Sequence, residues 1–317
     1  MEAAQNSKIT TLAEAAALVP DGAHVALGGF AIARNAMAFA RELIRQGRRG
    51  LTVSQGICGL ESDLLAGAGA VERLIYGGGS LDKFGLLICI NRLIEQRKIV
   101  AEAYSGLAIT FKFLAGALGL PFLPIRSIRA SDVLARAREV ALDQVAEVTC
   151  PFTGEPLLVL RALVPDVAVI QVQEADALGN ARIYGPRWDN WEAARAARRV
   201  IVIAEEIVST DAIRDWPEMT AIPGHRVQAV VPLAYGAHPT ALYHCYDYDA
   251  EHLQEYAAAA KDPAALPRYL DTYVYGPADH EAYLARVGGR DRLGRLAADE
   301  EVGYAPARAP GTPGGRG

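Results

Sequence analysis

Short apolar runs, each followed by a turn and an amphipathic stretch, recur along most of this chain and are the feature that most restricts its fold. The first run, His24–Leu27, leads into Gly28-Gly29-Phe30, and residues 35–46 then place apolar side chains with the period of a helix. A longer helical stretch lies between Leu107 and Gly119. The other runs that are typical of strands are Leu51–Val53, Arg73–Tyr76, Val167–Val172 and Arg199–Ala204.

The order of these segments predicts an α/β fold with a mainly parallel sheet flanked by helices. Two runs, 167–172 and 199–204, are apolar at nearly every position, which is typical of strands that are buried on both faces. In sheets of this kind, ligands bind at the loops beyond the carboxyl ends of the strands. The loops after the predicted strands are therefore the places to search for a functional site.

Composition divides the chain into three parts. Residues 1–247 hold the alternating strands and helices and predict one α/β domain. From 248 to 304 the apolar runs stop, and Ala-rich helical sequence predicts a C-terminal extension of the same domain, with Tyr256 and Tyr283 among its packing residues. Residues 305–317 are mostly Pro, Gly, Ala and Arg, which bury too little apolar surface to fold, so we expect a disordered tail.

Charge and hydropathy exclude several classes of protein. The 317 residues are 51% hydrophobic and 22% charged, as in a globular protein, with a formal net charge of −5. This mild acidity argues against a nucleic-acid partner, which needs a concentrated basic surface. No apolar run is long enough to cross a bilayer, and the first residues lack the segments of a signal peptide. We therefore expect a cytoplasmic protein without a membrane partner.

The cysteines give no sign of a metal site or a disulfide. Cys58, Cys89, Cys150 and Cys245 are far apart and form no CxxC pair. Four free thiols fit a reducing cytoplasm, and Cys58 lies in a Gly-rich loop, which allows exposure of its thiol. We expect no bound metal.

Two glycine-rich turns follow predicted strands. Gly28-Gly29 lacks side chains, so its backbone can approach a ligand closely and offer N–H groups to an oxyanion or phosphate. Gly77-Gly78-Gly79-Ser80 forms a similar turn and adds a hydroxyl donor. Both also fit ordinary strand-ending turns, and the first is not a GxGxxG dinucleotide fingerprint. Alone, neither turn identifies a ligand.

Seven segments along residues 8–210 are informative because of the order in which they occur. They are Ala26–Phe30 with Arg34 and Met37, Ala66–Val71, Phe113–Pro124, Pro151–Glu155, Pro165–Ala168, Ala175–Asn180 and Ala204–Val208. In this order they resemble the A (alpha) subunits of family I CoA-transferases of the glutaconate CoA-transferase type, which open on a GGF signature. The Leu-Pro-Phe-Leu-Pro run at 120–124 and the Ala-Asp…Gly-Asn element at 175–180 are the most specific parts of the resemblance.

The resemblance implies a CoA-transferase fold and an enzyme that moves CoA between carboxylic acids through a glutamyl-CoA thioester. In two-subunit members the nucleophilic Glu lies on a separate B (beta) subunit, in a turn after a strand. The matching strand end here is Leu51–Gly56, where Gln55 is an amide and cannot form the intermediate. We therefore expect this chain to be inactive without a B subunit. Its substrates would be an acyl-CoA and a small carboxylic acid, with no permanently bound cofactor.

The implied site lies between two subunits, and this chain supplies one of its walls. We expect Gly28 and Gly29 to present N–H groups near the reacting carbonyl. Ser54 and Ser80 would donate hydrogen bonds to the acid, although each also fits a local turn. Glu102 is the one catalytic candidate on this chain. The predicted substrate- and CoA-binding residues are Gly28, Gly29, Phe30, Ser54, Gln55, Gly78, Gly79, Ser80 and Ser105.

Glu102 and Ser105 also have a simpler interpretation. Ser105 is a good N-cap for the helix that follows, and an acidic residue near a helix start is electrostatically favourable. Elsewhere the chain departs from the family pattern: Ala36 replaces a common Pro, Gln171 stands where relatives often have His, and Arg129–Asp132 replaces a Gly-Ser-Asp turn. These differences bear on the acid substrate more than on the fold, so no particular acid is predicted.

Three other functions are compatible with parts of the sequence. A hydrolase of cyclic β-keto acyl-CoA on the same fold would use an acid of this chain, but the spacing back from Leu120 places Gly106 there, and only a shift of a few residues brings in Glu102. A non-catalytic sensor of acyl-CoA or sugar phosphate usually carries a basic DNA-binding segment, which is missing. A nicotinamide oxidoreductase would need the missing dinucleotide fingerprint.

Overall fold

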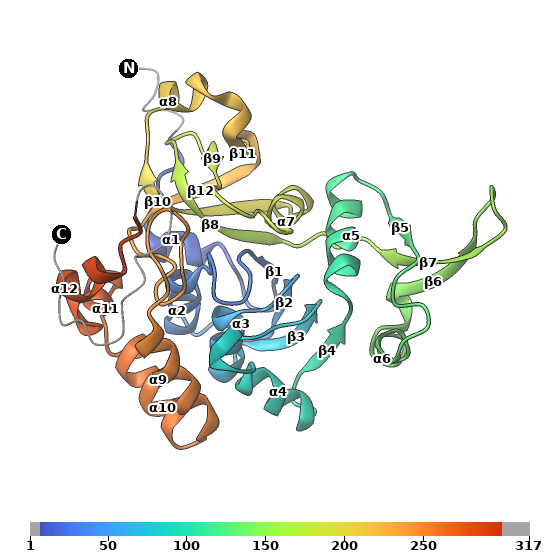
Figure 1. Cartoon of the computed structure of the whole chain (residues 1–317), viewed down its shortest axis with the longest axis horizontal. Helices are drawn as coiled ribbons and strands as arrows, with labels where there is room; N and C mark the ends of the chain where they lie inside the picture. The colour runs from blue at the N-terminus through green and yellow to red at the C-terminus, as the bar shows by residue number, and fades with distance from the viewer. Residues whose placement is uncertain (1–6, 300–317) are drawn as a thin grey trace.

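A mostly parallel β-sheet lies at the centre of the protein, as the computed structural model of residues 7–299 shows (Figure 1). Its parallel strands are β1 (His24–Leu27), β2 (Leu51–Gln55), β3 (Val71–Tyr76), β4 (Val100–Ala103), β8 (Val167–Ala175), β10 (Arg199–Ile207) and β12 (Val227–Pro232). They lie in the order β12-β10-β8-β1-β2-β3-β4. Two short antiparallel strands, β9 (Ala181–Arg182) and β11 (Thr220–Ile222), continue from the end of β8. The predicted α/β class is confirmed.

Helices cover both faces of this sheet, and each face has its own apolar core. On one face lie α1 (Leu12–Ala17), α2 (Met37–Arg45), α3 (Leu60–Gly67), α4 (Ile88–Glu95), α9 (Ala250–Lys261) and α10 (Ala265–Leu270). On the other lie α5 (Gly106–Ala117) and α7 (Asn190–Ala196). Because β8 and β10 are covered on both sides, residues 167–172 and 200–204 are buried throughout, as their apolar composition predicts.

The strand order reverses at β1, and this reversal positions the site. From β1 the chain runs outward through β2, β3 and β4, whereas β8, β10 and β12 extend the sheet in the opposite direction. The connecting helices lie on one face for the first set, and α7 lies on the other face for the second. The loops after β1 and β8 therefore diverge, and such a switch point is where ligands bind in doubly wound folds.

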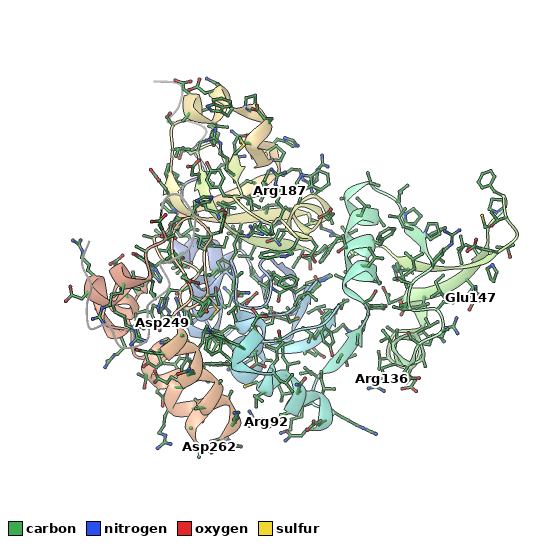
Figure 2. All side chains as sticks on the ribbon, in the orientation of Figure 1. Arg92, Arg136, Glu147, Arg187, Asp249 and Asp262 are labelled. Carbon is green, nitrogen blue, oxygen red and sulfur yellow. The ribbon has the colours of Figure 1, made fainter. Side chains whose placement is uncertain are left out.

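A small lobe, which the sequence pattern did not reveal, extends from the main body on the right of Figure 1. It is an antiparallel sheet in the order β5-β7-β6, joined by α6 (Asp132–Val140). Its strands are β5 (Phe122–Ile125), β6 (Val145–Thr149) and β7 (Pro156–Arg161). The preceding helix, α5, ends at Ala117, and Pro124 is tolerated inside β5 because β5 is an edge strand. Figure 2 labels Arg136 and Glu147 on the lobe, away from the central sheet.

The C-terminal region packs onto the central sheet. It consists of α9, α10, α11 (His280–Arg286) and α12 (Gly289–Leu293), while α8 (Thr210–Asp215) lies earlier, after β10. Tyr256 and Tyr283 are buried, as predicted, and the Tyr256 hydroxyl donates to Asp63 at 2.7 Å. Among residues 7–299, no helix combines the length and apolar composition that crossing a membrane requires. The predicted tail, 305–317, lies outside the described residues.

Asp249, labelled in Figure 2, connects the C-terminal helices to the segment around His238. Its carboxylate caps α9 through the His252 N–H and accepts two hydrogen bonds from Arg292, at 2.7 and 2.8 Å. His238 lies 3.2 Å from the same carboxylate. Burial by itself would raise the pKa of Asp249, but the hydrogen bonds from His238 and Arg292 hold it below its ordinary value. These buried contacts tie three distant segments together.

Gly116 on α5 allows the helix to approach the segment before β8, and replacing it tests that contact. A Cβ at this position would lie 2.1 Å from the Leu163 carbonyl oxygen. We expect Gly116→Ala to lower the free energy of unfolding by about 1–2 kcal/mol, although alanine favours the helix. Urea unfolding measures the change. Gly294→Ala is the matched control, because nothing lies within 4 Å of its Cβ; an equal loss there would contradict the close-contact explanation.

Candidate active site

The loop after β1 is held at the switch point by hydrogen bonds to the other half of the sheet. The Gly28 N–H donates to the Val169 carbonyl at 2.9 Å, and the Gly29 N–H donates to Asn190 Oδ1 at 2.8 Å. A Cβ on Gly28 would lie 2.6 Å from Asn190 Oδ1, and Gly29 has a φ of +89°. Close approach and conformation therefore both require glycine here.

This arrangement corrects one prediction. Gly28 and Gly29 were expected to offer N–H groups to a reacting carbonyl, but both N–H groups already have acceptors inside the chain. A backbone donor that is paired in this way is not available as an oxyanion donor unless the loop rearranges. In this structure the glycines shape the loop and let Asn190 approach it.

Gln55, at the end of β2, joins the loop after β1 to the start of α3. Its amide nitrogen donates to the Gly28 carbonyl at 2.8 Å and to Glu61 at 2.6 Å. Its amide oxygen accepts from the Ser62 hydroxyl at 2.7 Å. The side chain is completely buried. The structure thus brings together Gln55 and Gly28, two of the predicted site residues, and uses the amide for internal hydrogen bonds.

The glycine turn after β3 lies against the loop after β2. The Gly77 N–H donates to the Gly56 carbonyl at 2.9 Å, and the Gly78 carbonyl accepts from the Cys58 N–H at 2.9 Å. A Cβ on Gly79 would lie 2.9 Å from the Cβ of Cys58. Cys58 itself is fully buried, which raises the pKa of its thiol, so the idea that its Gly-rich loop exposes the thiol is wrong. The three loops after β1, β2 and β3 form one edge.

Phe30 and Arg34 share an aromatic partner that the sequence analysis missed. The Phe30 ring stacks on Trp188 with centroids 4.8 Å apart, and the Arg34 guanidinium lies 4.9 Å from the Trp188 ring centroid. Arg34 also donates to the Arg187 carbonyl at 3.3 Å. Burial lowers the pKa of Arg34 to about 10, partly opposed by the charge of Asp189. The cluster joins the loop after β1 to residues 187–188.

Two buried carboxyl groups flank the same edge. Burial raises the pKa of Asp189 to about 6, although backbone N–H groups and Arg34 partly oppose the rise. Burial raises the pKa of Glu61 to about 7, although the hydrogen bond from Gln55 partly opposes the rise. Titratable groups shifted in this way are common at functional sites, and also in structural networks. No sequence signal linked Asp189 and Asn190 to glycines about 160 residues earlier.

The remaining predicted residues have local partners. Ser54 Oγ lies 2.9 Å from His24 Nε2, on the face of the sheet opposite Gln55. Ser80 Oγ accepts from the Asp82 N–H at 3.2 Å, and Ser105 Oγ caps α5 through the Ala108 N–H at 3.2 Å. Glu102 is buried and pairs with Arg73 and the Tyr104 hydroxyl. Ser54 and Glu102 therefore lie away from the glycine loops, whereas Ser80 belongs to the glycine turn after β3 and Ser105 precedes Gly106, which lies against Gly77.

Comparison with known proteins identifies the family. The family model described as Coenzyme A transferase matches residues 9–232. This chain belongs to the coenzyme A transferase family.

Several relatives share almost the whole fold. The chain is 36% identical to the A subunit of the glutaconate CoA-transferase of Acidaminococcus fermentans, over 94% of this chain and 97% of that one. The crystal structure of that glutaconate coenzyme A-transferase superposes with a TM-score of 0.90, covering 95% of this chain and 99% of that chain at 34% identity. The decarboxylase AibA/AibB superposes with a TM-score of 0.74 and 31% identity, covering 84% of this chain and 98% of that chain. The resemblance to the glutaconate branch is confirmed.

A further relative is longer than this chain. An uncharacterized protein of Archaeoglobus fulgidus is 37% identical over 91% of this chain, and the match spans 64% of that protein's length. The family model and these relatives establish the family and the fold. The roles of individual site residues in this chain stay predictions.

The raised pKa of Glu61 predicts a specific dependence of stability on pH. Below its ordinary pKa of 4.5, Glu61 is protonated in both states, and between 4.5 and about 7 only the folded state keeps the proton. Stability relative to Glu61→Gln should therefore fall across this window by about 3 kcal/mol and level off above it.

Denaturant unfolding of the two proteins from pH 4.5 to 8 measures this difference. Glu139→Gln, on the exposed side of α6, is the control and should show no such trend relative to the wild-type chain. A constant difference between wild type and Glu61→Gln across the range would contradict the raised pKa of the buried carboxyl group.

Proposed function

We propose that this chain is the A (alpha) component of a two-subunit CoA-transferase that exchanges CoA between an acyl-CoA and a free carboxylic acid. Membership of the coenzyme A transferase family and the similarity to the A chain of a glutaconate CoA-transferase support this activity. The partner would be a separate B subunit, in a heterodimer or a dimer of heterodimers in the cytoplasm. The site would lie at the edge formed by the loops after β1, β2 and β3.

The proposal that the nucleophile lies on the partner rests on Gln55, which is an amide with both ends hydrogen-bonded. Its strand end matches the position at which the B subunits of this family are expected to hold a Glu. An amide nitrogen is a poor nucleophile, and both ends of this amide are used by Gly28, Glu61 and Ser62. Glu61 is fully buried and Asp189 nearly so. The accessible carboxylate that covalent catalysis requires would therefore come from the B subunit.

The chemistry that this family implies proceeds in balanced steps. The partner's Glu carboxylate attacks the acyl-CoA carbonyl and displaces the CoA thiolate, which leaves a mixed anhydride. The thiolate then attacks the glutamyl carbonyl of the anhydride, which releases the first acid and leaves a glutamyl-CoA thioester. A second acid reverses both steps and leaves as the new acyl-CoA. Each step moves an acyl group without an oxidant or a reductant.

This chain would form one wall of the site between the two subunits. Gly28 and Gly29 keep the loop after β1 narrow, and the stacked Phe30 and Trp188 rings give it a rigid apolar side. The turn at Gly78, Gly79 and Ser80, with Ser105 beyond it, would form the neighbouring part of the wall. Ser54 and Gln55 would support the wall indirectly, because their hydrogen bonds fix the end of β2. Excluding water matters because water can intercept the same thioester.

The hydrolase alternative depends on Glu102, whose surroundings do not favour it. Its carboxylate pairs with Arg73 and accepts from Tyr104, and the side chain is only 3% exposed. An acid that activates water needs to reach both the water and the substrate. We therefore place the transferase first.

Acyl exchange between a panel of acyl-CoAs and free acids tests the proposal. We expect exchange only when the chain is combined with a B subunit, together with a borohydride-sensitive Glu on that partner. Exchange by this chain alone would contradict the proposed division of roles. CoA release without an acceptor acid, abolished by Glu102→Ala, would instead support the hydrolase.

Gly29→Ala tests the shape of the loop. At a φ of +89° and with a Cβ 2.8 Å from the Arg34 carbonyl oxygen, alanine would distort the loop. We expect the rate of exchange to fall by about a hundredfold or more, since small displacements of a reacting wall have effects of this size. Gly22→Ala is the control, because it has a φ of +74° but nothing within 4 Å of its Cβ. Equal activity in the two variants would contradict a role for the loop.

A further inference from the structure

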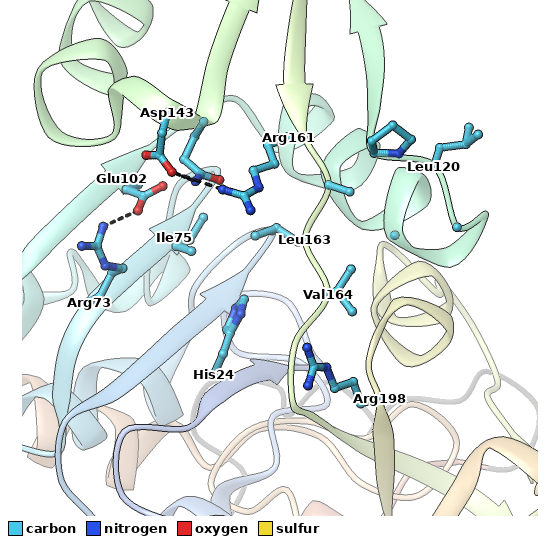
Figure 3. A pocket seen from close by; sticks show the side chains of 15 residues that line it. His24, Arg73, Ile75, Glu102, Leu120, Asp143, Arg161, Leu163, Val164 and Arg198 are labelled. Atoms are coloured by element: carbon cyan, nitrogen blue, oxygen red, sulfur yellow. Dashed lines mark hydrogen bonds and ion pairs between the residues drawn. The ribbon is translucent and has the colours of Figure 1, made fainter.

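A cavity of about 780 Å³ lies between the central sheet and the small lobe, and the proposed function does not use it (Figure 3). Its walls come from the sheet face at β1, β3 and β4, from the C-terminal part of α5, and from residues 161–164 between β7 and β8. This volume is in the range of sites for small organic molecules.

Three guanidinium groups from separate segments surround the cavity (Figure 3). Arg73 lies on β3, Arg161 ends β7, and Arg198 directly precedes β10. Their side chains are 38%, 64% and 72% exposed, so a ligand can reach all three. Arg73 is paired with Glu102. The other two arginines form longer ion pairs: Asp143 lies 3.2 Å from Arg161, and Asp166 lies 4.0 Å from Arg198.

A fourth cation lies behind the wall. Lys112 is on α5, one turn before Gly116, which lines the cavity. Its side chain is fully buried, and its Nζ has no hydrogen-bond acceptor among the described residues. Its ammonium group lies 4.8 Å from the centroid of the Tyr104 ring. A buried ammonium without an acceptor is costly, and its field favours an anion on the other side of the wall.

Two carboxylates, Glu102 and Asp143, also line the cavity and pair with Arg73 and Arg161, and the other lining groups are mostly apolar. Ile75, Leu120, Pro121, Leu163 and Val164 contribute hydrocarbon surface. Burial lowers the pKa of the His24 imidazole to about 4, so His24 adds no charge at neutral pH. The lining thus offers cations for an acidic group and an apolar surface for an organic one.

This cavity runs from near the carboxyl ends of β3 and β4, at Ile75 and Glu102, toward the start of β1. His24 opens β1, whereas Gly28 follows its end, and four residues of extended strand span about 13 Å. Arg198 and Val164 likewise precede β10 and β8. The cavity therefore extends to the opposite ends of these strands.

We propose that this cavity binds a phosphate ester of a small organic molecule. A single guanidinium satisfies both oxygens of a carboxylate, whereas a phosphate group has three or four oxygens that accept from several directions. Arg161 and Arg198 have the most exposed side chains and the longest ion pairs of the three, so they would turn to the phosphate. The apolar wall would hold the organic part.

Calorimetric titration of the full-length chain with phenyl phosphate, glycerol 3-phosphate and adenosine monophosphate tests the site. We expect at least one of these esters to bind, and its dephosphorylated counterpart to bind at least tenfold more weakly. The variant Arg161→Ala/Arg198→Ala should weaken binding of that ester at least tenfold. Binding should also weaken as salt concentration rises, because exposed cations are screened.

Arg126→Ala is the matched control, since Arg126 is an exposed arginine of the same lobe that pairs with Glu155 outside the cavity. It should bind the ester like the wild-type chain. No binding of any ester, or unchanged binding by the double variant, would overturn the proposal. Benzoate that binds as tightly as phenyl phosphate with the same arginine dependence would overturn the choice of phosphate. Competition by CoA but not dephospho-CoA would identify the bound ester as the CoA 3′-phosphate, and its absence would indicate a separate ligand.

Discussion

The buried side-chain amide of Gln55 is the interaction on which the candidate site most depends. It connects the carbonyl of Gly28, the carboxyl group of Glu61 and the hydroxyl of Ser62, and so joins the ends of two strands to the start of α3. Removing the amide would leave three buried polar groups without a partner, and each such group costs about 1–3 kcal/mol. Gln55 therefore holds these segments together, and its hydrogen-bonded side chain is not available as a nucleophile.

The proposed division of roles between two subunits depends on this strand end. A strand end that carries an amide in a closed hydrogen-bond network gives a rigid, chemically inert wall. The same strand end with an accessible carboxylate would give a nucleophile. The buried carboxyl groups near this edge follow the same logic, because Glu61 and Asp189 have raised pKa values and little exposure. Both properties suit positioning of the loops better than contact with a substrate.

Charged groups differ in exposure between the glycine loops and the face toward the small lobe. Around the glycine loops, charge is buried and paired with aromatic rings or amides, as with Arg34 over Trp188. At the face toward the small lobe, Arg161 and Arg198 stay exposed beside a cavity, and Lys112 is buried on α5. A buried cation without an acceptor is tolerated when other interactions hold the fold, and α5 supplies these through its packing on both sides.

The sequence by itself determined the α/β class, because strands buried on both faces must be apolar throughout, and the alternation of runs and helices left a parallel sheet as the consistent arrangement. It also placed Gln55 and the glycine turns at strand ends, and its ordered motifs indicated the family. It did not reveal the lobe at 122–161, since short antiparallel strands with an edge proline resemble irregular sequence.

Only the tertiary structure decided which groups meet. It placed Asn190 against Gly29 and Trp188 against Phe30, and it brought Ser54 to His24. It also gathered Arg73, Arg161 and Arg198 around one cavity. The physical reason is that local sequence governs the period of a segment and its turns, whereas contacts between residues more than a hundred positions apart depend on strand order.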